Sequence, residues 1–168
     1  MLAVKGKSFE GATVSISGSG NVAQFAAEKV LDLGGKVVTL SDSGGFVYDP
    51  DGIDRAKLEW VMDLKNNRRG RISEYADQFP SAQYTAVDRN LDHNPLWNVN
   101  VDVALPCATQ NELNGADAAN LVANSVTAVA EGANMPCTPE AIELFLKNKV
   151  LFAPGKASNA GGVAVSGL

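Results

Sequence analysis

The chain contains 168 residues, of which 45% are hydrophobic and 20% are charged, and its net charge at pH 7 is -5. This length can bury one sizeable hydrophobic core, so we expect a single domain, and the acidic balance argues against nucleic acid as a partner. No apolar run reaches the roughly 20 residues that span a bilayer, and the first residues lack a signal-peptide core, so we expect a soluble cytoplasmic protein that binds no membrane.

A strand, a helix and a second strand are predicted near the start of the sequence. Residues 13–17 alternate polar with β-branched side chains, residues 21–33 carry apolar side chains at helical spacing, and residues 36–40 again resemble a strand. Gly34 and Gly35 follow the helix, where a left-handed cap is favourable. This pattern is typical of a βαβ unit.

The alternation of strands and helices continues to the end of the sequence. Asp54 occupies the N-cap position of a predicted helix over 57–64, after a short predicted strand over 46–48, and a polar loop is expected over 88–98. The remaining predicted helices are 72–79, 116–123 and 138–147, and the remaining predicted strands are 84–87, 101–105, 127–130 and 150–153. We therefore expect an α/β fold, namely a Rossmann-like, doubly wound, mostly parallel sheet with helices on both faces.

A glycine-rich motif, Gly18-Ser-Gly-Asn-Val-Ala23, joins the first predicted strand to the first predicted helix. This context is the one that the dinucleotide-binding pattern G-x-G-x-x-G/A requires. Gly18 would permit the tight turn, and Gly20 would let backbone N–H groups approach a pyrophosphate at the helix N-terminus. The alternative is a plain turn, in which the glycines only satisfy backbone geometry.

Asp42 follows the second predicted strand, about 20 residues beyond the motif, where an acidic side chain can accept hydrogen bonds from the adenosine ribose. By this rule Asp42 favours NAD, because a carboxylate would repel the additional phosphate of NADP. Its alternative role is to cap the glycine-rich turn that follows it.

Five segments resemble successive motifs of glutamate dehydrogenases, in the same order and at matching spacing. They are Ser17-Gly-Ser-Gly-Asn-Val-Ala23, Ser41-Asp-Ser43, Ala104-Leu-Pro-Cys-Ala-Thr-Gln-Asn-Glu112, Ala130-Glu-Gly-Ala-Asn-Met-Pro136 and Pro154-Gly-Lys-Ala-Ser-Asn-Ala-Gly-Gly-Val163. The resemblance runs from about Phe9 to the last residue. It implies that residues 1–168 correspond to the coenzyme-binding domain alone, without the substrate domain and the C-terminal helices of full-length relatives.

For the full-length relatives, the resemblance implies the reversible oxidative deamination of L-glutamate to 2-oxoglutarate and ammonia, with hydride passing between substrate and a nicotinamide coenzyme. Those relatives are homohexamers. In the family, the lysines that hold the substrate and the aspartate that moves protons lie in the other domain. We therefore expect no catalytic residue in this chain, which should bind coenzyme without turning over glutamate.

The resemblance also implies a set of binding residues. The coenzyme-binding residues that it implies are Gly18, Ser19, Gly20, Asn21, Val22, Ser41, Asp42, Ser43, Lys65, Arg68, Ala108, Thr109, Gln110, Asn134 and Asn159. Val163 and Ser166 match positions that line the glutamate side-chain pocket. The amide side chains suit a ribose or carboxamide, because they offer a donor and an acceptor without adding charge.

Asp42 favours NAD, but other residues of the sequence favour NADP. Ser19 and the Ser41-Asp-Ser43 stretch resemble the NADP-dependent branch of the small bacterial-type enzymes, and Lys65 and Arg68 match basic positions that would meet a 2′-phosphate. We therefore expect NADP, with NAD as the alternative. Arg69 and Arg71 are interpreted instead as solvated cations at a helix end.

The sequence leaves three other residues without a catalytic or binding role and three other functions open. His93 is expected to be a solvated surface residue, and Cys107 and Cys137 to be free thiols without a metal or catalytic role. The alternative functions are a stand-alone dinucleotide-binding module without catalysis, the coenzyme domain of a related leucine, valine or phenylalanine dehydrogenase, and a structural protein in which the glycines are only turns.

Overall fold

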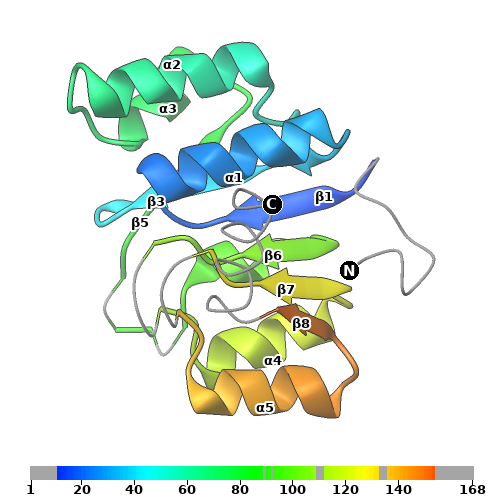
Figure 1. The fold of residues 1–168 in the computed structure, drawn as a ribbon. Coiled ribbons are helices and arrows are strands. Elements are labelled where there is room, and N and C mark those ends of the chain that lie inside the picture. The colour runs from blue at the N-terminus through cyan, green and yellow to red at the C-terminus, as the bar shows by residue number, and fades with distance from the viewer. Residues whose placement is uncertain (1–10, 89, 92, 109–111, 133–135, 154–168) are drawn as a thin grey trace.

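A parallel sheet forms the centre of the computed structural model, which describes residues 11–88, 90–91, 93–108, 112–132 and 136–153 (Figure 1). Its strands lie in the order β2-β1-β6-β7-β8, and every neighbouring pair is parallel. Their bounds are Thr13–Ile16 for β1, Lys36–Val37 for β2, Val103–Leu105 for β6, Ala128–Ala130 for β7 and Leu151–Ala153 for β8.

Helices cover both faces of this sheet, as the alternation of strands and helices predicted (Figure 1). Helices α1 (Asn21–Asp32) and α2 (Arg55–Asn66) lie on one face, and α4 (Gly115–Ala123) and α5 (Pro139–Lys147) on the other, while α3 (Ser73–Gln78) packs against residues 45–48 and 83–86 outside this sheet. Successive residues of a strand point to opposite faces. Accordingly Val14, Ile16 and Val103 pack in the core beneath α1 and α2, whereas Ala104 and Val129 pack in the core with α4 and α5.

A second, antiparallel sheet of β3 (Thr39–Asp42), β4 (Gly45–Tyr48) and β5 (Gln83–Ala86) was not predicted. The prediction of one continuous strand over 36–40 was wrong. The chain leaves the parallel sheet after Val37, and Thr39 begins a strand of the other sheet. The Thr39 hydroxyl then donates to Ile16 O (3.0 Å) and accepts from Ile16 N (2.9 Å), so a side chain takes over from the backbone ladder. Only two residues join β3 to β4, and so short a connection requires antiparallel pairing.

The predicted N-cap at Asp54 and the predicted glycine cap after residue 33 agree with the structure, whereas α2 extends two residues beyond its prediction at each end. Asp54 is the N-cap of α2 and accepts from Lys57 N at 2.9 Å, and Gly34 has a φ of 85° just after α1. The segment expected as a polar loop over 88–98 instead contains a short 3₁₀ helix, η2 (Pro95–Asn98), whose Trp97 is completely buried. Burial of this one large side chain fixes the segment against the core.

Both cysteines are free and buried. Burial, reinforced by the charge of Glu112, raises the pKa of Cys107 to about 12, so its thiol stays protonated at neutral pH. Among the helices that the structure describes, none is long and apolar enough to cross a membrane.

Candidate functional site

A cleft of about 520 Å³ opens at the carboxyl ends of β1 and β6. It is lined by Ser17, Gly18, Ser19, Gly20, Asn21, Val22, Ser41, Asp42, Ser43, Lys65, Asn94, Cys107, Ala108 and Glu112. The chain runs from β1 to β2 on one side of β1, and β6 lies on the other side, so the sheet order reverses here. Such a switch point is where open α/β sheets bind their ligands.

The glycine motif forms the floor of this cleft. Gly18 has a φ of 85°, and a Cβ at this position would lie only 3.1 Å from Cys107 O, so both the turn and the neighbouring loop require glycine. Gly20 is the N-cap of α1 and has open space around its Cα. No side chain among the described residues caps α1, so its first N–H groups face the cleft and suit an anion.

Ser41 fastens the glycine turn to the start of the antiparallel sheet. Gly18 N donates to Ser41 Oγ at 2.6 Å, and Ser41 N donates to Gly18 O at 3.0 Å. Behind the turn, the buried Gln24 amide donates to Ser19 O at 2.8 Å. These contacts give Ser41 a structural role that the sequence did not indicate, beside its predicted role as a coenzyme-binding residue.

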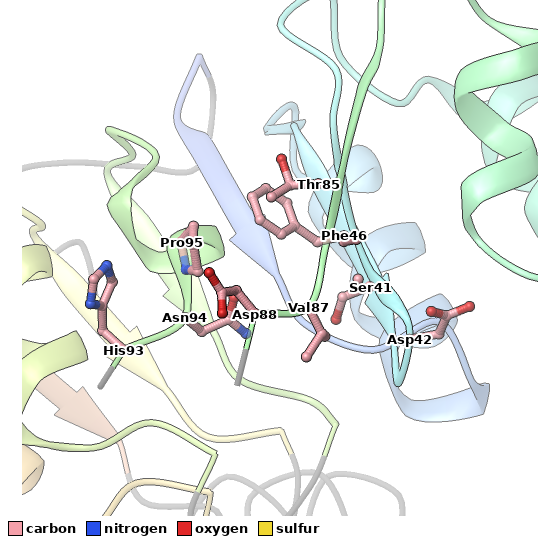
Figure 2. Close-up of a pocket in the computed structure, with 11 residues that line it drawn as sticks. Ser41, Asp42, Phe46, Thr85, Val87, Asp88, His93, Asn94 and Pro95 are labelled. Carbon is pink, nitrogen blue, oxygen red and sulfur yellow. The ribbon is translucent and has the colours of Figure 1, made fainter. Parts of the chain in front are cut away.

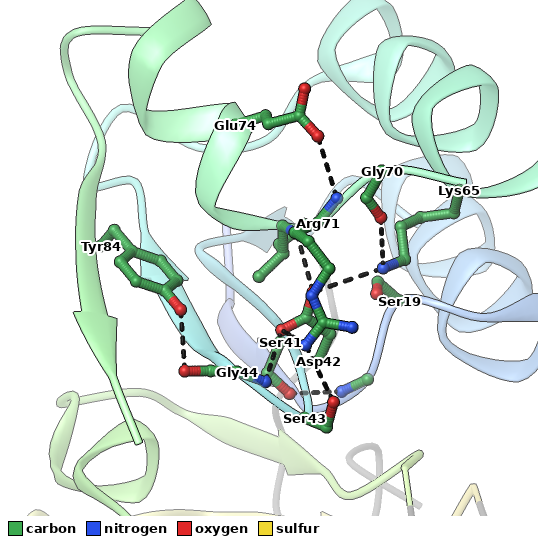
Figure 3. A network of polar contacts seen from close by, with 12 residues as sticks. Ser19, Ser41, Asp42, Ser43, Gly44, Lys65, Gly70, Arg71, Glu74 and Tyr84 are labelled. Carbon is green, nitrogen blue, oxygen red and sulfur yellow. Dashed lines mark hydrogen bonds and ion pairs between the residues drawn. The ribbon is translucent and has the colours of Figure 1, made fainter. Parts of the chain in front are cut away.

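Asp42 is the centre of a polar network at the end of β3 (Figure 3). Its carboxylate accepts from Gly44 N (2.9 Å) and Ile72 N (2.8 Å), and it pairs with Lys65 Nζ (3.3 Å) and Arg71 Nη2 (3.4 Å). Burial raises the pKa of Asp42, but the two backbone hydrogen bonds and the two cations outweigh burial, so the pKa lies below its usual value. The contact with Gly44 is the turn cap that was the alternative role for Asp42.

The cations around Asp42 differ from those that the sequence indicated. Lys65, which is expected to meet a 2′-phosphate, pairs with Asp42 and also donates to Gly70 O at 3.0 Å. Arg71, interpreted from the sequence as a solvated cation, reaches Ser43 Oγ at 2.9 Å as well as Asp42. Arg68 points elsewhere: its Nε pairs with Asp63 at 2.9 Å, and its guanidinium lies over the ring of Trp60.

Local backbone geometry explains why Arg71, and not Arg68, lies beside Asp42. Gly70 N donates to Leu64 O at 2.8 Å, and Arg69 has a φ of 51°, so the chain reverses sharply after α2. Arg68 precedes this reversal and stays on the outer side of α2, whereas Arg71 follows it and returns to β3. Spacing along the sequence carries no signal for such a reversal.

A smaller pocket of about 180 Å³ adjoins the cleft and shares Ser41, Asp42 and Asn94 with it (Figure 2). The other residues that line it are Gly45, Phe46, Thr85, Ala86, Val87, Asp88, His93 and Pro95. Asn94 is held by its backbone N–H, which donates to Asp117 Oδ1 at 2.7 Å. His93, expected at the surface, is half-buried in this wall, because η2 anchors the segment that carries it.

The loop after β6 is joined to the end of β1 by two side chains that the sequence did not single out. Ser17 Oγ donates to one carboxylate oxygen of Glu112 and accepts from Cys107 N at 2.9 Å. The other oxygen of Glu112 accepts from Ala108 N at 2.9 Å. A position 95 residues away in sequence thus completes the wall beside the glycine motif.

The structure gathers most of the predicted binding residues in one place. Those that line the cleft are Gly18, Ser19, Gly20, Asn21, Val22, Ser41, Asp42, Ser43, Lys65 and Ala108. Arg68 is not among them. Thr109, Gln110, Asn134, Asn159, Val163 and Ser166 lie outside the described residues.

Comparison with known proteins agrees with the fold. The family model for Glutamate/Leucine/Phenylalanine/Valine dehydrogenase matches residues 1–168. The NADP-specific glutamate dehydrogenase of Haemophilus influenzae is 60% identical, and the NAD-specific glutamate dehydrogenase of Bacteroides fragilis is 52% identical, each over all of this chain. The chain spans 36% of the length of each relative. The crystal structure of Plasmodium falciparum glutamate dehydrogenase superposes with a TM-score of 0.89 at 44% identity, over 99% of this chain and 34% of that one.

Proposed function

Because the chain belongs to the glutamate/leucine/phenylalanine/valine dehydrogenase family, we propose that residues 1–168 are the coenzyme-binding domain of an NADP-dependent glutamate dehydrogenase. In this proposal the longer protein interconverts L-glutamate and 2-oxoglutarate plus ammonia. The high identity to an NADP-specific relative supports the choice, and the 36% coverage of that relative leaves room for a separate substrate domain. The substrate-binding and proton-transfer groups would then lie in that other domain.

One observation carries the proposal for NADP: two cations surround a single carboxylate at the end of β3. Lys65 and Arg71 together outweigh the charge of Asp42, and two backbone N–H groups already occupy its oxygens. Asp42 therefore does not present the free negative charge on which the rule for NAD depends. Lys65, Arg71 and the Ser43 hydroxyl would instead donate to a 2′-phosphate, and charge-assisted hydrogen bonds to phosphate are strong.

The two adjoining cavities suggest how the chain would hold the rest of the coenzyme. The first N–H groups of α1 would bind the pyrophosphate, and the pocket beside Phe46, Val87 and Pro95 would take the adenine ring. The nicotinamide half would then extend past β1 toward Ala108. When bound, the coenzyme supplies or accepts the hydride, while this chain binds and orients it.

NAD is the second candidate coenzyme, because the 52% identical relative from Bacteroides fragilis is NAD-specific. Calorimetric titration of the chain with NADP and, separately, with NAD under the same buffer and salt distinguishes the two. We expect tighter binding of NADP. Tighter binding of NAD would overturn the assignment of Lys65 and Arg71, and binding of neither would contradict a coenzyme-binding domain.

Substitution of the arginines makes the test specific. Arg71→Ala should weaken NADP binding about 10- to 100-fold, since a charged hydrogen bond contributes about 1.5–3 kcal/mol, and should leave NAD binding unchanged. Arg68→Ala is the matched control, because Arg68 pairs with Asp63 on the outer side of α2. Equal losses from the two substitutions would contradict the proposed phosphate site.

Turnover provides a separate test of the domain assignment. The 168-residue chain should bind NADPH but should not oxidise it when 2-oxoglutarate and ammonium are added. Steady oxidation of NADPH by the purified chain would show that the catalytic groups lie within these residues.

A further inference from the structure

We propose that Glu112 is a positioning residue that fixes the wall of the cleft on which the nicotinamide half of the coenzyme would rest. This inference rests on the proposed function, since it concerns one half of the same ligand. Glu112 belongs to neither the glycine motif nor the phosphate site, and it reaches the cleft from the loop that precedes α4.

The backbone after β6 is held by side chains. Cys107 and Ala108 follow Pro106, and their N–H groups find no partner in the parallel ladder. Cys107 N donates to Ser17 Oγ at 2.9 Å and Ala108 N donates to Glu112 Oε2 at 2.9 Å, while Ser17 Oγ itself donates to Glu112 Oε1. One carboxylate therefore organises both N–H groups, one directly and one through Ser17.

The junction is too tight to tolerate a shift of this loop. A Cβ at Gly18 would lie 3.1 Å from Cys107 O and 3.3 Å from Ala108 Cα, so the glycine turn and the loop touch each other. On the other side, Gly132 N donates to Pro106 O at 2.9 Å and joins the loop to the end of β7. Between these contacts, Glu112 is the group that sets the position of Ala108.

The sheet order places this wall away from the adenosine end of the cleft. Asp42 and Lys65 lie beyond β1 on the side of β2, whereas β6 borders β1 on its opposite side. A dinucleotide that crosses the glycine turn from Asp42 would therefore meet Ala108 and Glu112 only with its second half. Glu112 should then affect the whole dinucleotide and not its adenosine fragment.

The test compares two probes on one variant. Glu112→Gln keeps the size of the side chain but removes its charge, and an NH2 group replaces one of the two separate oxygens that accept from Ser17 and Ala108. We expect this substitution to weaken NADPH about tenfold in calorimetric titration and to change the affinity for adenosine 2′,5′-bisphosphate by less than about twofold. Glu143→Gln, the same change on an exposed face of α5, is the control and should alter neither affinity.

A second variant tests whether the loss of affinity comes from the contact between Glu112 and Ser17 or from a general loss of stability. Ser17→Ala removes the hydroxyl that joins Glu112 to Cys107 N and should give the same selective loss of NADPH. If either variant weakens the binding of both probes equally, or weakens neither, the role of Glu112 is overturned. The proposed function still stands in that case, provided that the wild-type chain binds NADPH. Failure of the wild-type chain to bind NADPH would overturn both.

Discussion

The two ends of the β3–β4 ribbon carry the same kind of polar centre in different surroundings. At one end, Asp42 pairs with Lys65 from the last turn of α2 at 3.3 Å. At the other end, Asp49 pairs with Lys57 from the first turns of the same helix at 2.9 Å. The carboxylate of Asp49 is completely inaccessible, whereas Asp42 borders the cleft and its partner Arg71 is 56% exposed.

The partners of the two carboxylates explain this difference. Asp49 accepts from Tyr75 OH at 2.6 Å and from Ser81 Oγ at 2.9 Å, both from the α3 region, so its oxygens are satisfied entirely by groups packed around it. Asp42 and its partner Lys65 instead line the open cleft. The same chemistry therefore stabilises the fold at the closed end and leaves cations that a ligand can share at the open end.

The largest expected effect is at the closed end. Asp49→Asn leaves the Lys57 ammonium half-buried without its counter-charge, and breaking a buried pair costs about 3–5 kcal/mol of the free energy of unfolding. Urea denaturation of wild type and variant measures this loss. A loss below about 1 kcal/mol, the range of exposed pairs, would mean that the two ends do not differ.

Acid should reveal the part of this stabilisation that depends on ionisation. Burial raises the pKa of Asp49, but the hydrogen bonds from Tyr75, Lys57 and Ser81 outweigh burial and lower it below the ordinary 3.8. Unfolding then takes up protons, so this contribution is complete above pH 3.8 and is lost as the pH falls through the folded pKa. We expect the melting temperature of Asp49→Asn to fall less steeply below about pH 4 than that of wild type, and parallel curves would contradict this.

Removal of the charge at the open end should cost less. Asp42→Asn should lower the free energy of unfolding by about 1–3 kcal/mol, because Arg71 is 56% exposed and remains solvated, while Lys65 is 17% exposed and loses its counter-charge as Lys57 does. The same substitution should leave NADP binding intact or strengthen it, because Lys65 and Arg71 keep their charge. Urea denaturation and calorimetry on the same preparations give both quantities, and loss of NADP binding would show that Asp42 itself holds the coenzyme.

The smallest effect is expected at Arg68, because the carboxylate with which it pairs is exposed. It pairs with Asp63 at the surface and lies 4.9 Å from the centre of the Trp60 ring. Arg68→Ala should therefore destabilise the chain by only about 0.5–1 kcal/mol. Repeating the denaturation in 1 M NaCl should reduce this difference, as screening weakens an exposed pair, whereas an unchanged difference would assign it to packing on Trp60.

Most of the fold could be predicted because local patterns determine it. Polar and β-branched residues alternate along β1, buried residues recur at helical spacing along α1, and Asp54 caps the helix that its position indicated. The unpredicted antiparallel sheet depends instead on how the Thr39 hydroxyl replaces a strand partner of Ile16. Such a choice between sheets is made by contacts across the fold, and the apolar pattern of residues 36–40 suits either sheet.

The candidate site also combines features set by local sequence with contacts set by the tertiary structure. The sequence by itself determined the glycine turn, the helix that follows it and the acidic residue about 20 positions on, because each is a local requirement of strand, turn and helix. Only the tertiary structure decided that Arg71 and not Arg68 meets Asp42, and that Glu112 meets Ser17. These pairs lie 29 and 95 residues apart, and a contact between distant residues is set by chain reversals and strand order, which spacing along the chain does not record.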